Sequence, residues 1–458
     1  MIRQIIAVAA LAAGFARGAQ AEDAVLARLL EEAVAASPEV AQARAAVLGE
    51  SARVPQAGAF PDPTLTLGIQ NDGFDRIKVG EVETSFYNVM ITQPVPWPGK
   101  RGLRESIATL EQRRAQARLQ RTLLDLEGRV RRAYLALVLV DARLELLQEQ
   151  ERLWMQAEHA ARARYEAGQT PQSDLLRAQL ERARLQQQRW ALEADSIGAV
   201  AELNRDRARP LDEPIRGRAK LAQTPDPQVA SHAEAQRDAE ERSPELQLSL
   251  LGAEQSARRV DLARRERWPD LAVTAAVMPR GSLEPMWQLG VSVGLPIFSR
   301  RGSAVEESEQ RRAGAEQGAA AVRQVLQLRT HHRLLTLAAL NRTNQQYRSQ
   351  ILVLSAAAVR STLGQYEVGR VPFAAVLEAL SGYVGDRTAY LASVGEAQLV
   401  AIAQRELSLE AGPSMGGGGG SGPMPGAAGV SAGTSSQPAQ AENPGAGANS
   451  PARSMSGM

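Results

Sequence analysis

Apolar residues recur every seven positions along the stretch between Pro98 and Pro171, which contains no proline. They form one continuous seam, made of Leu123, Val130, Leu137 and Leu144 interleaved with Leu126, Ala133, Val140, Leu147 and Trp154. A heptad seam is typical of helices that pack side by side over a long distance. The stretch between Pro296 and Pro372 also lacks proline and is rich in helix-forming residues. We therefore expect two helices of about 90 Å, far longer than ordinary globular helices.

Glycine and proline predict where the long helices end. Gly168 and Gly369 suit left-handed turns after a helix, and Pro171 and Pro372 suit the start of the next helix. The pattern predicts shorter helices that run back over about 172–209 and 373–410, and opening helices at about 38–57 and 244–267.

Four segments alternate apolar and polar residues with a period of two, which is typical of strands. The clearest is Trp287–Leu295, where five apolar residues alternate with Gln, Gly and Ser. Turn-rich segments join the four into two hairpins. The predicted strands lie at about 63–71, 85–96, 270–279 and 286–296. Alternating strands of this length suit a membrane β-barrel.

Aromatic residues flank the predicted strands. Phe60 and Trp268 precede the first and third strands, and Trp97 and Phe298 follow the second and fourth. Because all four strand ends of two hairpins lie at one level, these residues suit an aromatic belt at the membrane interface. The alternative is that they are core aromatics at helix–strand junctions.

The chain repeats itself. Ser37-Pro38-Glu39 returns as Ser243-Pro244-Glu245, and Phe60-Pro61-Asp62 returns as Trp268-Pro269-Asp270. Pro96 with Arg101-Gly102 and the Tyr-x-x-Gly element at 165–168 return as well, all at offsets of 200 to 208 residues. Such self-similarity predicts one unit built twice. We expect a first repeat at 22–210 and a second at 211–410, intertwined in one body.

The two ends of the chain have distinct compositions. Arg3, a short apolar run and the Ala19-Gln20-Ala21 site predict a secretory signal peptide over 1–21. The mature chain would then begin at Glu22, which cannot accept a lipid as a cysteine would. Residues 411–458 are mostly Gly, Ser, Pro and Ala, a composition that favours disorder.

Charge and cysteine content exclude several functions. The chain has no cysteine, so disulfides, thiolate metal sites and cysteine nucleophiles are absent. Loss of the signal peptide removes Arg3 and Arg17 and leaves equal numbers of basic and acidic residues, which gives no support for nucleic-acid binding.

Four strands cannot enclose a pore. Open strand edges in hydrocarbon leave backbone groups unpaired at several kcal/mol each, and the smallest membrane barrels have about eight strands. The barrel must therefore be shared between copies of the chain, with eight, twelve or sixteen strands for two, three or four copies.

The ordered set of duplicated motifs, with Pro-Trp-Pro-Gly-Lys-Arg at 96–101 and the signal peptide, resembles the TolC-like outer-membrane efflux proteins. The resemblance covers about residues 24–410. It implies a mainly α fold with a small membrane β-hairpin part, assembled as a homotrimer with a twelve-stranded barrel and a periplasmic α-helical barrel. The Pro-Trp-Pro-Gly-Lys-Arg segment and Glu22 in place of cysteine are more similar to the heavy-metal-cation (CzcC-like) branch than to the drug branch.

The resemblance also implies a function and partners. It implies a passive exit duct in the outer membrane of a Gram-negative bacterium, with most of its mass in the periplasm. A periplasmic adaptor would join it to an inner-membrane resistance-nodulation-division pump, and the cargo would be divalent heavy-metal cations. Drug efflux, type I protein secretion and a periplasmic coiled-coil adaptor remain as alternatives.

By the same resemblance, the Tyr-x-x-Gly turns form the periplasmic tip that contacts the adaptor, through Tyr165, Gly168, Pro171, Tyr366, Gly369 and Pro372. Glu378 matches an acidic-ring position of the family, whereas Ala375 departs from the second one. We expect Arg177 and Glu378 to pair and close this gate. The alternatives are plain helix caps, tyrosines that pack within the helical core, and two unrelated solvated charges.

No catalytic motif appears in the sequence. His331 and His332 are neighbours, which a helix points about 100° apart, so they do not form a chelating pair of the i, i+4 type. We expect no enzymatic activity, no cofactor and no resident metal.

Overall fold

The computed structural model describes residues 24–221, 224–295 and 301–409. The predicted signal peptide (1–21), the predicted tail (411–458) and Phe298 lie outside the described residues.

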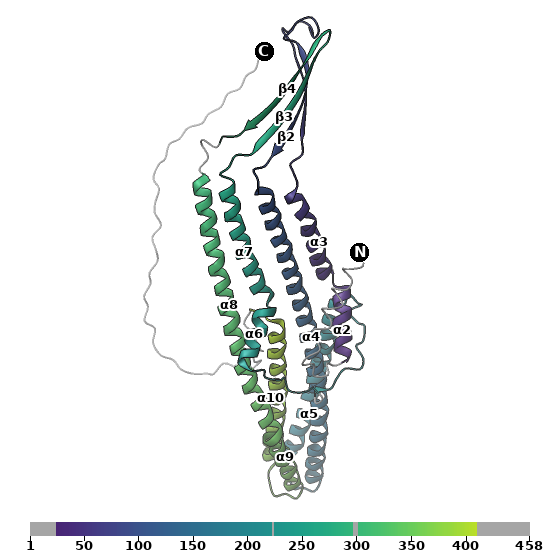
Figure 1. Ribbon diagram of the computed structural model, residues 1–458. Coiled ribbons are helices and arrows are strands. Elements are labelled where there is room, and N and C mark those ends of the chain that lie inside the picture. The colour runs from purple at the N-terminus through teal and green to yellow at the C-terminus, as the bar shows by residue number, and fades with distance from the viewer. Residues whose placement is uncertain (1–23, 222–223, 296–300, 410–458) are drawn as a thin grey trace, which may run out of the picture. The chain divides into compact units, whose positions relative to one another are not determined.

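Helices make up most of the described chain (Figure 1). The longest, α4, runs without interruption over Lys100–Glu166, 67 residues, which is about 100 Å at the rise of an α-helix. Its buried positions include Leu126, Val140 and Trp154 of the predicted heptad seam. The other helices are α2 (Ala24–Ala36), α3 (Pro38–Gly58), α5 (Gln172–Asp206), α6 (His232–Arg242), α7 (Pro244–Arg265), α8 (Arg301–Gln346), α9 (Leu352–Glu367) and α10 (Phe373–Glu406).

The duplicated Ser-Pro-Glu motif is a duplicated helix start. The side chains of Ser37 and Ser243 accept hydrogen bonds from the backbone N–H groups of Val40 (3.4 Å) and Leu246 (3.3 Å). Proline follows in the first turn of α3 and α7. A backbone N–H at this position has no acceptor within the helix, so proline, which lacks the N–H, costs no helical hydrogen bond.

The helices pack around α4. Near the sheet, α3, α4, α7 and α8 contact one another in that order (Figure 1). Farther from the sheet, α5 and α10 pack on α4. One core joins α2, α4, α5 and α10 through residues such as Leu29, Leu137 and Leu203. A second core, closer to the tips, includes Trp154 and Tyr366. The two repeats therefore share their cores, as an intertwined body requires.

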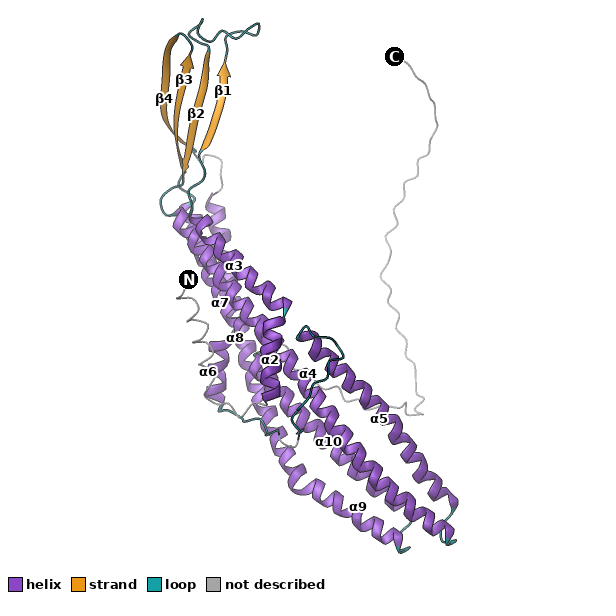
Figure 2. Cartoon of the chain, turned by 90° about the vertical axis from the view of Figure 1, so that its right-hand side faces the viewer, coloured by secondary structure: helices purple, strands orange, loops and turns teal. Residues whose placement is uncertain are grey.

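Four antiparallel strands form one sheet at the other end of the helices from the tips (Figures 1 and 2). The strands are β1 (Thr64–Gln70), β2 (Phe86–Val95), β3 (Leu271–Arg280) and β4 (Leu283–Val293), and they lie in sequence order. β1 with β2 and β3 with β4 form the hairpins, and β2 pairs with β3 to join the repeats.

A π-helical turn, Tyr347–Ile351, interrupts the second long helix between α8 and α9. Arg101 and Arg301 are 200 positions apart, whereas Tyr165 and Tyr366 are 201 apart. The second helix thus carries one residue more than the first between these landmarks. A π-turn closes its hydrogen bonds one residue later than an α-turn, so we interpret it as the place where the additional residue is accommodated.

None of the helices within the described ranges is both long and apolar enough to cross a membrane.

Candidate functional site

The sheet has one continuous apolar face. Paired positions across all four strands place Leu65, Ile91, Ala275 and Leu289 on the same row. The large apolar side chains of this face are exposed, for example Leu67 at 69%, Leu289 at 68% and Trp287 at 78%. An apolar surface of this extent is usually buried against a partner or a membrane. Strands with one apolar and one polar face bury the apolar face in lipid in membrane barrels.

The opposite face of the sheet is mainly polar or small, apart from Phe86, Met90, Met278 and Met286. Thr64, Thr92, Thr274 and Gly290 occupy one row, and the hydroxyls of Thr92 and Thr274 lie 3.3 Å apart, within hydrogen-bond distance. Within the described residues, the outer edges of β1 and β4 pair with no further strand. The sheet of one protomer therefore has two open edges.

Three of the four predicted interface aromatics lie at the junction between helices and strands. The rings of Trp97 and Trp268 stack with centroids 5.1 Å apart. The guanidinium of Arg101 lies 3.5 Å from the ring centroid of Phe60, a cation–π contact. Phe60 and Trp268 are more than half exposed, so these two rings are available to an interface as well as to the junction.

A buried lysine clamps the junction together. Lys100 at the start of α4 donates from Nζ to Oδ1 of Asp270 (2.7 Å) and to the carbonyl of Trp268 (2.8 Å). The backbone N–H of Trp97 donates to the same Asp270 oxygen (2.8 Å). Partial burial raises the pKa of Asp270, but the hydrogen bonds from Lys100 and Trp97 outweigh it and lower the pKa overall. The clamp joins the first repeat to the second where helices turn into strands; the sequence analysis missed it.

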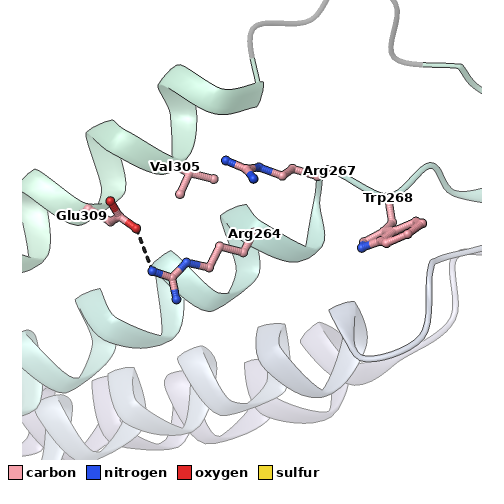
Figure 3. Close-up of a pocket in the computed structure, with 5 residues that line it drawn as sticks. All are labelled: Arg264, Arg267, Trp268, Val305 and Glu309. Carbon is pink, nitrogen blue, oxygen red and sulfur yellow. Dashed lines mark hydrogen bonds and ion pairs between the residues drawn. The ribbon is translucent and has the colours of Figure 1, made fainter.

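An open hollow of about 600 Å³ lies beside this clamp, between the ends of α7 and α8 (Figure 3). It is lined by Arg264, Arg267, Trp268, Val305 and Glu309. Arg264 and Glu309 form an ion pair of 2.7 Å across it, which ties the two helices together.

The two tip turns have the same backbone geometry. Gly168 and Gly369 adopt φ of +69° and +77°. At each turn two backbone hydrogen bonds close a Schellman motif: Gln169 to Arg164 with Gly168 to Tyr165, and Arg370 to Gln365 with Gly369 to Tyr366. Pro171 and Pro372 then precede α5 and α10 as their N-cap residues. The glycines thus have the conformation that the sequence analysis expected.

The two tip tyrosines differ. Tyr366 is fully buried and packs edge-on against Phe373, with ring centroids 5.5 Å apart. Arg164, from the first tip, lies over the Tyr366 ring and donates to its carbonyl (2.9 Å). Tyr165 is 41% exposed, so it is the tyrosine whose side chain is open to a partner. Arg164 was missed by the sequence analysis, because the second repeat has Gln365 at the matching position.

The predicted gate residues, Arg177 and Glu378, are both exposed, on α5 and α10. Among the described residues of one protomer neither forms an ion pair. Their expected pairing remains a prediction about the assembled protein.

Comparison with known proteins identifies the class. Residues 29–205 match the outer membrane efflux protein family. Solved structures share the fold over most of this chain. CusC, which forms a transmembrane channel, is 14% identical with a TM-score of 0.71 and covers 84% of this chain and 92% of that one. VceC of Vibrio cholerae is 17% identical with a TM-score of 0.70, covering 84% and 96%.

A third similar structure is the open state of the MtrE outer membrane channel of Neisseria gonorrhoeae. It is 16% identical with a TM-score of 0.67 and covers 83% of this chain and 88% of that one. No curated protein sequence matches the chain.

The fold is therefore that of outer-membrane channels, with a four-stranded sheet at one end of long helices. Residues 29–205 of the chain are thus similar to outer membrane efflux proteins. The TolC-like resemblance is thereby confirmed, whereas membership of the heavy-metal branch remains a prediction.

Proposed function

We propose that three copies of this chain assemble into the passive exit duct of a tripartite efflux system. The observation that supports this most directly is the four-stranded sheet, with an exposed apolar face and two unpaired edges. In hydrocarbon both edges must be paired, and neighbouring copies supply the missing strands. Three copies give the twelve strands that the family resemblance implies.

The flanking helices support the same assembly. Four large apolar side chains are exposed on α5: Leu176, Leu180, Trp190 and Ile197. A second exposed set lies on α8 and α9: Leu328, Leu335, Val353 and Leu354. We name these sets the α5 seam and the α8/α9 seam. Each seam contains one spacing of seven, Trp190 to Ile197 and Leu328 to Leu335, as in helices that pack on another helix. We propose that the α5 seam of one copy packs on the α8/α9 seam of the next.

The variant Trp190→Glu tests this interface. Trp190 is 63% exposed in one protomer, and a carboxylate at its place would be buried in the trimer, at a cost of several kcal/mol. We expect monomers where the unmodified protein gives trimers, measured by light scattering in detergent.

Two variants serve as controls for Trp190→Glu. Trp190→Phe keeps an apolar ring, and Gln188→Glu adds the same charge to α5 outside the seam; both should remain trimeric. A trimeric Trp190→Glu protein would exclude the proposed seam contact.

We propose divalent heavy-metal cations as the cargo. The supporting observations are the Pro-Trp-Pro-Gly-Lys-Arg segment at 96–101 and Glu22 in place of a lipid-accepting cysteine. A deletion strain should become sensitive to one or more salts of zinc, cobalt, cadmium, copper or silver, and the cloned chain should restore growth. Sensitivity to drugs alone would indicate drug efflux instead. Loss of a secreted protein would indicate type I protein secretion. The alternative of a periplasmic adaptor lacks support, because the family match is to efflux ducts.

We further propose that the tip turns dock a periplasmic adaptor, which links the duct to a resistance-nodulation-division pump. The natural chain has no cysteine, so Tyr165→Cys introduces a unique cross-linking site at an exposed tip position. It should cross-link to the adaptor, whereas Leu48→Cys, exposed on α3 near the sheet, should not. Equal cross-linking at both positions would argue against docking at the tip.

A further inference from the structure

We propose that His232 and His331 form a surface binding site for a late first-row divalent cation such as Zn²⁺, Cu²⁺ or Ni²⁺. The two residues are 99 positions apart in sequence, on α6 and α8, and their Nδ1 atoms lie 3.4 Å apart. The ring centroids are 4.8 Å apart and the ring planes are nearly perpendicular. The proposal is independent of the cargo of the duct.

The separation of the two nitrogens suits a metal. Imidazole nitrogens bind Zn²⁺ at about 2.0–2.1 Å with tetrahedral angles, which sets two such nitrogens about 3.3–3.4 Å apart. The two Nδ1 atoms already have this separation. In the tautomer that carries its proton on Nε2, each neutral imidazole has a lone pair on Nδ1, so a cation can accept both Nδ1 lone pairs with no net loss of a proton from either ring.

The backbone under the two histidines is fixed before any metal arrives. His232 is the first residue of α6 and lies between Ser231 and Glu234, which form the capping box of that helix. Two turns further on, Glu240 accepts a hydrogen bond from Gln327 of α8 (2.8 Å).

An apolar contact holds the same two helices together. Ala239 of α6 and Leu326 of α8 are buried in one small core. His232 contacts His331, whereas Glu240, later on α6, contacts Gln327, earlier on α8. The two helices therefore run antiparallel. A site on two packed helices needs little further ordering to bind its ligand.

Water completes the coordination in this proposal. Both histidines are exposed, and within the described ranges no group of three or more His, Asp or Glu side chains is placed to hold a metal ion. The site is thus a two-imidazole site with open positions, which suits imidazole-binding metals rather than Ca²⁺ or Mg²⁺.

The sequence analysis expected no metal site, because it considered only histidines close in sequence. No local spacing reveals a pair that forms between α6 and α8. The other two histidines, His159 and His332, are also exposed on helices. They serve as matched controls.

The test is Zn²⁺ titration by calorimetry on the whole protein, purified in detergent without a histidine tag. We expect one Zn²⁺ per protomer. His232→Ala and His331→Ala should each weaken binding by roughly tenfold or more, and His159→Ala and His332→Ala should leave it unchanged. Ca²⁺ should not bind at this site.

Thermal unfolding gives a second readout. A cation that binds only the folded state raises the midpoint, so Zn²⁺ should raise the midpoint of the unmodified protein and of both controls, but not of the two pair variants. His331→Gln keeps a polar side chain and guards against a folding defect. If the pair variants bind Zn²⁺ as well as the controls do, or if the unmodified protein binds none, the proposal is wrong.

Discussion

At the residue scale, the junction between helices and strands depends on one buried cation. The Lys100 side chain is 4% exposed, and its ammonium is held by Asp270 and by the Trp268 carbonyl. Lys100→Met keeps the length of the side chain but leaves two acceptors without this donor. We expect a loss of about 2–3 kcal/mol in the free energy of unfolding, measured as a lower thermal midpoint in detergent.

Lys220→Met is the matched control for Lys100→Met. Lys220 forms an ion pair of 3.0 Å with Glu145, but both side chains are more than half exposed. Exposed pairs contribute about 0–1 kcal/mol, so this variant should unfold near the midpoint of the unmodified protein. Equal effects of the two substitutions would show that burial of Lys100 is not what stabilises the junction.

A second residue-scale prediction concerns pH. Hydrogen bonds, first of all from Arg182 on α5 (2.6 Å), lower the pKa of Glu158 on α4. Because the pKa is lower in the folded state, the stabilisation is present at neutral pH and is lost as pH falls below the ordinary glutamate value into the acid range. Glu158→Gln should unfold more readily at neutral pH and show a flatter acid dependence of the thermal midpoint. An unchanged dependence would contradict this role.

At the element scale, we interpret the π-turn as the place where the long helix of the second repeat accommodates its one additional residue. Deletion of Ser349 within the turn should convert it to α-helix and keep α9 in register, because the turn holds the additional residue. Deletion of Gln148 from the unbroken helix α4 would instead rotate every later residue by about 100°. We expect a nearly unchanged thermal midpoint for the first deletion and loss of the folded protein for the second. Similar outcomes would refute the assignment.

The elements themselves could be predicted from sequence because each one repeats a local period. Heptads predicted α4, alternation predicted the strands, and Ser-Pro-Glu and Tyr-x-x-Gly predicted where helices begin and end. The clamp between Lys100 and Asp270 could not be predicted, since it joins residues 170 positions apart and depends on how the repeats meet. The offsets of 200 and 201 residues show that the second long helix has one residue more than the first. Only the structure shows the π-turn that marks its position.

At the scale of the whole molecule, three copies would bring three Glu378 side chains to the periplasmic end of the duct. Glu378 is exposed on the first turns of α10 and has no ion-pair partner among the described residues of one protomer. The matching residue of the first repeat is Arg177, so the ring would alternate acidic and basic positions. A ring of carboxylates at a constriction favours cations, and nearby arginines weaken that preference and allow pairing between copies.

Glu378→Ala in planar bilayers tests this ring. We expect a shift of the reversal potential towards lower cation preference, because three negative charges would leave the proposed ring. The proposed pairing with Arg177 would hold the tip closed, so its loss should also raise the open probability. Glu193→Ala removes an exposed carboxylate from the middle of α5 and should change neither quantity. The expected shift would show that cation selectivity depends on one residue per copy. An unchanged reversal potential and conductance in Glu378→Ala would instead place the constriction elsewhere along the helices.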